Sequence, residues 1–384
     1  MADYIILAGG WGRRLGTITF RRPKPLLPLA GRRILDYTLE EARLAGADHV
    51  KVIVDPRILP LRGVPEWVEA IPQPGPGIDN AIRAAVEAAG DSTLILSFTG
   101  YISRPRGVIR AALEHYSSVS EPGLAVVAPV STGLETFGFT RLGMGGRIER
   151  VTRSLEEWLA GRGYVFAGVL IVERKLAERL AGRPFHEALD SIAREGLLAA
   201  HVWQGDWAEI AYPWDLLDAR RIVLDPETTR ISRGSRVHET AYIGPGVHVD
   251  EGAWIGPRAV VVGPSYIGRN ARIEAGAIIA SSIIEEKAHI GVAAKVVGSH
   301  VLEEARIGAG ATVENSIIAE KAAVGANSVL EADEPGEQLP PLRGLHPPAP
   351  TPPKGVRLGP IIPPGYRVPA CSRLGPLQSP RRAE

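Results

Sequence analysis

Cysteine is almost absent from this chain of 384 residues, which contains a single one, Cys371. One cysteine excludes an internal disulfide framework and any cysteine-rich metal site. Neither positive nor negative residues predominate, because the formal net charge is only +1. This balance argues against a general binder of nucleic acid or membrane surfaces. Apolar runs are short, and none reaches the roughly 18 residues of a membrane-spanning helix.

The first residues, MADYIILAGG, carry neither a basic segment nor the long apolar run of a signal peptide. We therefore expect a cytoplasmic protein without a membrane or nucleic-acid partner. Hydrophobic residues make up 45% of the chain and charged residues 23%, which is enough for a buried core. The length suits about two domains.

Residues 1–224 alternate between short β-branched runs and helical patterns. The expected strands are Tyr4–Leu7, Val50–Val54, Thr93–Phe98, Leu124–Val130 and Val165–Val172, and the expected helices include Ile34–Ala45, Asp79–Ala89 and Arg106–His115. This alternation predicts an α/β domain with a Rossmann-like, mostly parallel sheet. In such sheets ligands bind at the carboxyl ends of the strands.

Residues 225–332 change to a period of six. Aliphatic side chains recur at Ile231, Val237, Ile243, Val249, Ile255, Val261, Ile267, Ile273 and Ile279, and the spacing then slips by one per turn; serine recurs at Ser265, Ser282, Ser299 and Ser316. A hexapeptide repeat predicts a parallel β-helix with three short strands per coil, and we expect about six coils.

Residues 333–384 are rich in proline. The first part is expected to be an irregular or extended excursion. The spacing of six resumes at Val356, Ile362, Val368 and Leu374. Two alternatives therefore stay open for this segment: a terminal coil that closes the β-helix after a loop, or a tail.

A glycine-rich turn follows the first expected strand. Gly9, Gly10 and Gly12 precede five cations, which are Arg13, Arg14, Arg21, Arg22 and Lys24. Backbone N–H groups of a glycine loop can cradle phosphate oxygens, and arginine adds planar bidentate contacts. The pattern indicates a polyphosphate site, although glycines alone would also suit a tight turn.

The stretch LAGGWGRRL, from Leu7 to Leu15, and the stretch RPKPLLPLAG, from Arg22 to Gly31, resemble the signature of the sugar-phosphate nucleotidylyltransferases. That family includes glucose-1-phosphate thymidylyltransferases and uridylyltransferases, and a left-handed β-helix after such a domain is a known arrangement in it. The resemblance implies that NTP, with dTTP or UTP favoured, and sugar 1-phosphate yield NDP-sugar and pyrophosphate. Catalysis in the family rests on positioning and charge neutralisation.

Carried over residue by residue, the resemblance gives Arg14 and Lys24 the catalytic roles. Arg14 would stabilise the leaving pyrophosphate, and Lys24 would bridge the α-phosphate and the sugar phosphate. The implied nucleotide-binding residues are Leu7, Ala8, Gly9, Gly10, Gly12, Arg13, Gln73 and Gly77. The implied sugar-phosphate residues are Gly138, Arg153 and Gly168.

The implied Mg²⁺ site departs from the family pattern. Where the family has Gly-Asp after a central strand, this chain has Gly100-Tyr101, and no acid lies within residues 94–105. The second acid of the pattern is kept as Glu209, which is one methylene longer. Because Mg²⁺ takes hard oxygen ligands, only Glu209 is left as an expected protein ligand.

Three hypotheses follow. The chain is a working sugar-1-phosphate nucleotidylyltransferase with an altered metal site, or it is a regulatory or structural subunit that binds nucleotide or NDP-sugar without turnover. In the third, the β-helix is an acyltransferase that uses a histidine base, for which His248, His289 and His300 are the candidates. The β-helix also favours a homo-oligomer.

Overall fold

The computed structural model describes residues 2–90, 93–129, 138–152, 163–181, 183–332 and 356–375. Contacts divide the chain into two compact units. The first contains residues 1–11 and 34–209, and the second contains residues 12–33 and 210–384. The glycine-rich stretch therefore passes from one unit to the other after Trp11, and the segment with its cations packs with the C-terminal residues.

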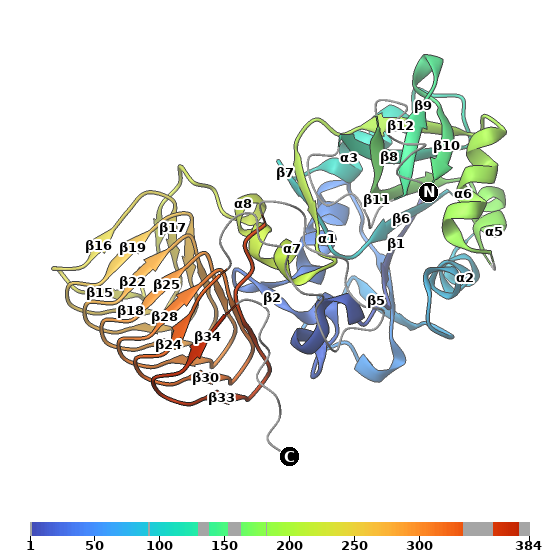
Figure 1. Cartoon of the computed structure of the whole chain (residues 1–384). Helices are drawn as coiled ribbons and strands as arrows, with labels where there is room; N and C mark the ends of the chain where they lie inside the picture. The colour runs from blue at the N-terminus through green and yellow to red at the C-terminus, as the bar shows by residue number, and fades with distance from the viewer. Residues whose placement is uncertain are drawn as a thin grey trace. The chain divides into compact units, whose positions relative to one another are not determined.

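The first unit is built on a nine-stranded sheet with the path β10-β9-β11-β6-β1-β4-β5, to which β8 is added beside β11 and β12 beside β8 (Figure 1). The strands are β1 (Asp3–Ala8), β4 (Val50–Val54), β5 (Val68–Pro72), β6 (Leu94–Phe98), β8 (Gly123–Pro129), β9 (Phe139–Leu142), β10 (Ile148–Thr152), β11 (Tyr164–Val172) and β12 (Leu198–Val202). The helices are α1 (Ile34–Leu44), α2 (Ile78–Ala88), α3 (Val108–Tyr116), α5 (Arg174–Leu180) and α6 (Phe185–Arg194). The predicted α/β architecture of Rossmann type is confirmed.

Strand direction is the part of this sheet that the alternation of elements did not reveal. β5, β4, β1 and β6 are parallel neighbours, but β11 runs antiparallel to β6, β8 and β9. Its side chains alternate between two cores. Leu170 and Val172 pack with residues of α2, α5 and α6, whereas Val169 and Ile171 pack with α3. Both faces are buried, so the strand reads as a continuous apolar run.

A buried carboxylate ties α1 to the small antiparallel sheet of β7 (Tyr101–Arg104) and β13 (Asp206–Glu209). Glu41 is only 4% exposed. Its two carboxyl oxygens accept hydrogen bonds from Ser103 Oγ at 2.9 Å and from the Gly107 N–H at 2.8 Å. Burial raises the pKa of Glu41, and these hydrogen bonds offset part of that rise.

The raised pKa gives Glu41 a testable effect on stability. Such a group favours the folded state below its unfolded-state pKa and loses this contribution as pH rises through the folded-state pKa. Relative to Glu41→Gln, the wild type should therefore lose free energy of unfolding as pH rises from about 4.5 upward. Urea unfolding of both proteins from pH 4 to pH 8, in roughly one-unit steps, measures the difference. A difference that is constant with pH would contradict this role.

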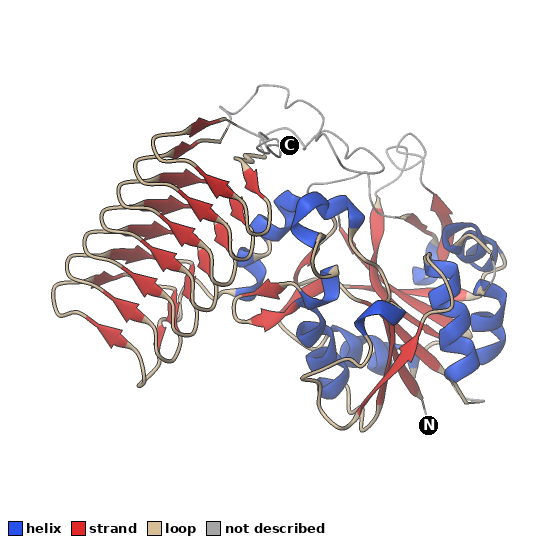
Figure 2. Cartoon of the chain, turned by 90° about the horizontal axis from the view of Figure 1, so that it is seen from below, coloured by secondary structure: helices blue, strands red, loops and turns tan. Residues whose placement is uncertain are grey.

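The second unit contains a parallel β-helix, in which three sheets of seven strands form the three faces (Figure 2). The first face has β14 (Arg230–Ile231), β17 (Val247–Val249), β20 (Ser265–Ile267), β23 (Ile283–Ile284), β26 (His300–Val301), β29 (Ile317–Ile318) and β32 (Ile361–Ile362). The second has β15 (Arg236–Val237), β18 (Trp254–Ile255), β21 (Arg272–Ile273), β24 (His289–Ile290), β27 (Arg306–Ile307), β30 (Ala323–Val324) and β33 (Arg367–Val368). The third has β16 (Tyr242–Ile243), β19 (Val260–Val262), β22 (Ile278–Ala280), β25 (Lys295–Val297), β28 (Thr312–Glu314), β31 (Val329–Leu330) and β34 (Arg373–Leu374). The hexapeptide β-helix predicted from the period of six is confirmed.

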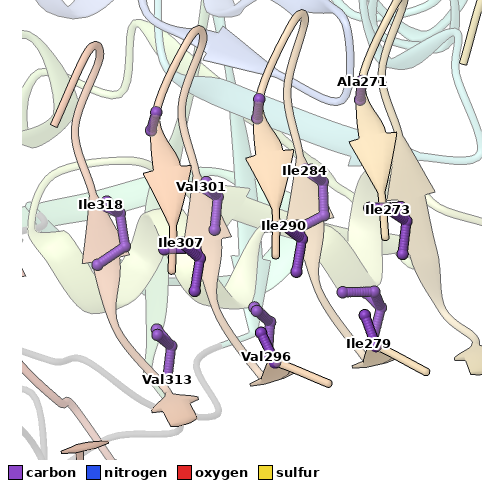
Figure 3. Packing of buried hydrophobic residues seen from close by; sticks show 14 of the residues in the cluster. Ala271, Ile273, Ile279, Ile284, Ile290, Val296, Val301, Ile307, Val313 and Ile318 are labelled. Atoms are coloured by element: carbon purple, nitrogen blue, oxygen red, sulfur yellow. The ribbon is translucent and has the colours of Figure 1, made fainter. Parts of the chain in front are cut away.

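The periodic residues serve two purposes. The aliphatic side chains point inward and stack in columns, as Ile273, Ile290 and Ile307 do in Figure 3. The recurring serines are buried and form a ladder in which the hydroxyl oxygen of each accepts the backbone N–H of the serine one coil later, at 3.0–3.1 Å. A serine at this position satisfies a backbone donor that would otherwise be buried without a partner.

The last described residues form a further coil. β32, β33 and β34 pair in parallel with β29, β30 and β31. Ile362 and Val368 lie in the core of the β-helix. Of the two alternatives for this end of the chain, the structure has the terminal coil over the residues where the spacing of six resumes.

The second unit also holds the short hairpin of β2 (Pro28–Leu29) and β3 (Arg32–Arg33) and the helices α7 (Pro213–Asp218) and α8 (Arg220–Val223). Ala30 and Gly31 form the turn of the hairpin, with φ values of 50° and 75°. Within the described part of the chain, no helix is both long and apolar enough to cross a membrane.

Candidate nucleotide site

The first half of the phosphate loop lies at the carboxyl edge of the parallel strands. Leu7 and Ala8 end β1 and are buried, and Gly9 and Gly10 follow them directly. The space next to Gly10, where a Cβ would lie, is open. Backbone N–H groups at this edge are therefore placed where an α/β sheet binds anions.

Gln73 follows β5 at the same edge and is 5% exposed. Its N–H donates to the Val54 carbonyl at 2.8 Å, and its side-chain amide donates to the Gly77 carbonyl at 2.9 Å. A Cβ on Gly9 would lie 1.7 Å from Gln73 Oε1, so any side chain at position 9 would displace the Gln73 amide. The structure thus brings Gly9, Gln73 and Gly77 together, as expected for one site. Gly77 is the N-cap residue before α2 and has a φ of 104°, a backbone conformation that favours glycine.

The second half of the loop carries the proposed catalytic cations. Gly12 has a φ of 85°, and a Cβ on it would lie 2.7 Å from Lys24 Cβ. Lys24 Nζ donates to the Ile210 carbonyl at 3.1 Å. The Arg14 guanidinium lies over the Tyr212 ring, 5.2 Å from its centroid, and Tyr212 stacks on Trp214 at 4.6 Å. Arg14 and Lys24 are thus both held against residues 210–212.

Two of the five cations have another partner. Arg22 forms an ion pair with Glu303 of the β-helix at 2.7 Å. Burial raises the pKa of the nearby Glu320, and the positive charges of Arg22 and Arg21 oppose that rise. Arg21 and Arg22 thus lie beside β-helix carboxylates. The high density of positive charge in this stretch of sequence therefore serves these contacts as well as the expected phosphate site. Arg13 begins the 3-10 turn Arg13–Thr19.

Tyr101 occupies the position of the first expected metal ligand and is built into an aromatic cluster. Its ring stacks on Trp207, with centroids 6.2 Å apart and an interplanar angle of 13°, and lies 6.4 Å from the Phe166 ring. Phe166 also contacts Phe98 and Phe185, at 5.4 and 5.7 Å. This cluster was not anticipated from the sequence, because its members come from five separate segments.

The same ring covers Gly168. A Cβ at Gly168 would lie 2.3 Å from two carbons of the Tyr101 ring, and the φ of Gly168 is 78°. The Tyr101 ring thus lies where a side chain at position 168 would be, and the assignment of Gly168 to the sugar phosphate stays a prediction. Gly138 is described and lies against Val151, whereas Arg153 lies outside the described residues.

The metal hypothesis is tested by Glu209 and its surroundings. Glu209 ends β13 and is aligned with Tyr101 across the β7–β13 pair. Mg²⁺ is usually bound by carboxylate oxygens, and the stacked Tyr101 ring supplies none. Among the residues that the structure describes, no three His, Cys, Asp or Glu side chains gather as metal ligands. Glu209 is therefore the one carboxylate left at this position, where the family pattern has two.

The three β-helix histidines each have a structural partner. His300 is completely buried and lies 3.0 Å from Glu285. His289 lies 3.0 Å from Glu274, and His248 lies 3.0 Å from the Thr228 carbonyl, with burial lowering the pKa of His248. These contacts favour packing roles, and His300, which has no solvent access, cannot meet an acyl substrate.

Two further residues near the loop were missed in the sequence. Arg57 lies over the Trp11 ring, 3.9 Å from its centroid, and thereby covers the loop residue between Gly10 and Gly12. Asp215 accepts the N–H groups of Ala211 and Tyr212 at 2.9 and 2.7 Å. Of Arg57 and Asp215, only Asp215 has a signal in the sequence, which is its position at the start of a helix, where side-chain oxygens accept backbone N–H groups.

Comparison with known proteins identifies both parts of the chain. Residues 4–135 match the MobA-like NTP transferase domain, and residues 246–281 match the bacterial transferase hexapeptide repeats. The chain therefore combines an NTP transferase domain of the type found in sugar-phosphate nucleotidyltransferases with a hexapeptide β-helix.

Three relatives illustrate the similarity. The chain is 25% identical to the bifunctional protein GlmU of Methanocaldococcus jannaschii over 60% of this chain and 56% of that protein. It is 26% identical to the low-salt glycan biosynthesis nucleotidyltransferase Agl11 of Haloferax volcanii, over 59% and 67%. It is 25% identical to the mannose-1-phosphate guanyltransferase of Emericella nidulans, over 60% and 66%. The match to GlmU thus spans little more than half of that protein.

Proposed function

We propose that this chain is a nucleotide-binding subunit that holds an NTP or an NDP-sugar in its N-terminal domain and does not carry out metal-assisted transfer. The observation that carries the proposal is the Tyr101 ring, which stacks on Trp207 and fills the space beside Gly168. The ring stands where the family pattern has a carboxylate, and it lies beside Gly168, one of the proposed sugar-phosphate residues. Loss of such charge stabilisation affects the transition state far more than ground-state binding.

The groups expected to bind phosphate are all kept. The loop from Leu7 to Gly12 supplies backbone N–H groups, and Arg14 and Lys24 supply positive charge. Arginine binds phosphate bidentately, and lysine binds it as a point charge. Gln73 and Gly77, at the same edge of the sheet as Gly9, are the proposed contacts of the base. The nucleotide is proposed to be dTTP or UTP.

A working sugar-1-phosphate nucleotidylyltransferase is the second candidate. It is favoured by Arg14 and Lys24, which match the family pattern, by the acid that is kept as Glu209, and by the name of the mannose-1-phosphate guanyltransferase relative. In that reaction a sugar-phosphate oxygen would attack the α-phosphorus of the NTP, and pyrophosphate would leave. Both candidates are compatible with a homo-oligomer formed through the β-helix, which we also propose.

Nucleotide binding that does not need a metal is the expected result for the subunit. Isothermal titration of the wild type with UTP and dTTP, with Mg²⁺ and with EDTA, should give binding in both buffers. Arg14→Ala should weaken binding by about 10- to 100-fold, the effect of losing a hydrogen bond to a charged group. The control is Arg236→Ala, which removes an exposed arginine of β15.

Two results would contradict the proposal. One is that the wild type binds neither UTP nor dTTP nor an NDP-sugar. The other is equal weakening by Arg14→Ala and Arg236→Ala, since the charge of the phosphate loop would then have no specific role.

A further inference from the structure

The loop that carries Arg14 and Lys24 is attached to the β-helix by its far end. Residues 12–33 and 210–384 form one compact unit. The hairpin β2–β3 closes the loop, and its turn, Ala30-Gly31, presents two backbone N–H groups. Both donate to one side chain of the β-helix, Glu285, which lies more than 250 residues further along the chain.

Glu285 is buried and holds the turn through both carboxyl oxygens. Its Oε1 accepts the Ala30 N–H at 2.8 Å, and its Oε2 accepts the Gly31 N–H at 3.0 Å. His300 Nε2 lies 3.0 Å from Oε1 on the other side. The side chains of Glu285 and His300 are each only 1% exposed. A buried carboxylate is tolerated only with donors of this kind.

Two further contacts fix the loop in the same place. Gly31 lies against Tyr266, because a Cβ on Gly31 would be 2.0 Å from Tyr266 Oη. That hydroxyl donates to Asp250 Oδ2 at 2.5 Å. The ion pair between Arg22 and Glu303 is the other contact. These contacts come from neighbouring coils of the β-helix.

The β-helix itself does not require a charge at this position. Ile267, Ile284, Val301 and Ile318 are in register on the first face. The residues that follow them are Gly268, Glu285, Leu302 and Ala319. Three of these coils thus have a small or apolar residue at the position of Glu285, whereas the coil of Val249, which is in register with Ile267, has another carboxylate, Asp250, which accepts the Tyr266 hydroxyl. The cost of burying the Glu285 carboxylate is offset by the two N–H groups of the hairpin turn and by His300 of the next coil.

We propose that Glu285 is a positioning residue for nucleotide binding: it fixes the Ala30-Gly31 turn and thereby the orientation of the segment that carries Arg14 and Lys24. This inference rests on the proposed function, because it takes a nucleoside triphosphate as the ligand. Nucleotide affinity and attachment of the hairpin to the β-helix are then coupled, and each strengthens the other.

Amide exchange and nucleotide titration of three full-length variants test the proposal. Glu285→Gln keeps the shape and one acceptor, Glu285→Ala removes both acceptors, and Glu314→Gln changes an exposed carboxylate of β28 that pairs with Lys295. Exchange of the Ala30 and Gly31 amides should accelerate by about 10-fold or more in Glu285→Ala and by less in Glu285→Gln. The Kd for UTP or dTTP should rise in the same order, by about 10-fold in Glu285→Ala. Glu314→Gln should match the wild type in both measurements.

Two controls distinguish a failure of this inference from misfolding of a variant and from a failure of the proposed function. Far-UV circular dichroism shows whether each variant is folded, and Glu285→Gln serves if Glu285→Ala is not. Faster exchange at Ala30 and Gly31 with an unchanged Kd would overturn the positioning role, as would unchanged exchange. If the wild type itself bound no nucleotide, the proposed function would fail and this inference would be withdrawn with it.

Discussion

Gly168→Ala is expected to lower the free energy of unfolding by about 2–5 kcal/mol, as the sum of two effects. The φ of 78° at Gly168 costs an alanine about 1–2 kcal/mol. The new methyl group would also lie 2.3 Å from the Tyr101 ring, and forced overpacking of this kind costs about 1–3 kcal/mol. Denaturant unfolding of the variant and the wild type measures the difference.

Two further variants separate the effects. Gly196 has a φ of 73° and open space where its Cβ would lie, so Gly196→Ala measures the backbone cost alone. In a Tyr101→Ala background, the cost of Gly168→Ala should fall to that of Gly196→Ala. The resulting coupling between positions 101 and 168 should be about 1–3 kcal/mol. A coupling near zero would mean that the Tyr101 ring does not fill the space beside Gly168, and the proposed function would lose its main support.

Ile290→Ala should lower the free energy of unfolding by about 2–5 kcal/mol, the usual cost of truncating a fully buried isoleucine. Ile290 is 0% exposed and stacks between the Ile273 and Ile307 positions in register with it (Figure 3). Its neighbouring coils cannot collapse into the space without breaking the register of the sheet. Unfolding followed by denaturant titration tests this expectation.

The matched control for this truncation is Ile278→Ala. Ile278 belongs to the same β-helix but is 43% exposed, and its loss should cost well under half as much, in line with the buried apolar area. Equal effects at the two positions would contradict the inward stacking of every sixth residue.

The regular elements could be predicted from the sequence because each has a local pattern. The alternation of strands and helices placed α1, α2, β1, β4 and β6 close to their observed bounds but missed β5, and the period of six indicated the β-helix. The buried serines show why a polar residue belongs to that period: each hydroxyl accepts a backbone N–H from the next coil. Such a repeat can be recognised in the sequence alone, without knowledge of contacts between distant residues.

The features that decide function depend on distant residues and could not be predicted. The antiparallel direction of β11 depends on pairing with β6 and β8, and the aromatic cluster around Tyr101 joins five segments. The hairpin turn at Ala30 and Gly31 meets Glu285 across more than 250 residues. Arg22 looked like a phosphate ligand because its partner, Glu303, is equally remote in the sequence.

Release of pyrophosphate is the most direct test of the central claim, that the chain binds nucleotide without transferring it. The wild type would be mixed with UTP or dTTP, common sugar 1-phosphates and Mg²⁺, at nucleotide concentrations that saturate binding. The account predicts no release above the rate without protein, while titration shows the nucleotide bound. Release that requires the protein and stops with EDTA would contradict it, and the chain would then be a working nucleotidylyltransferase.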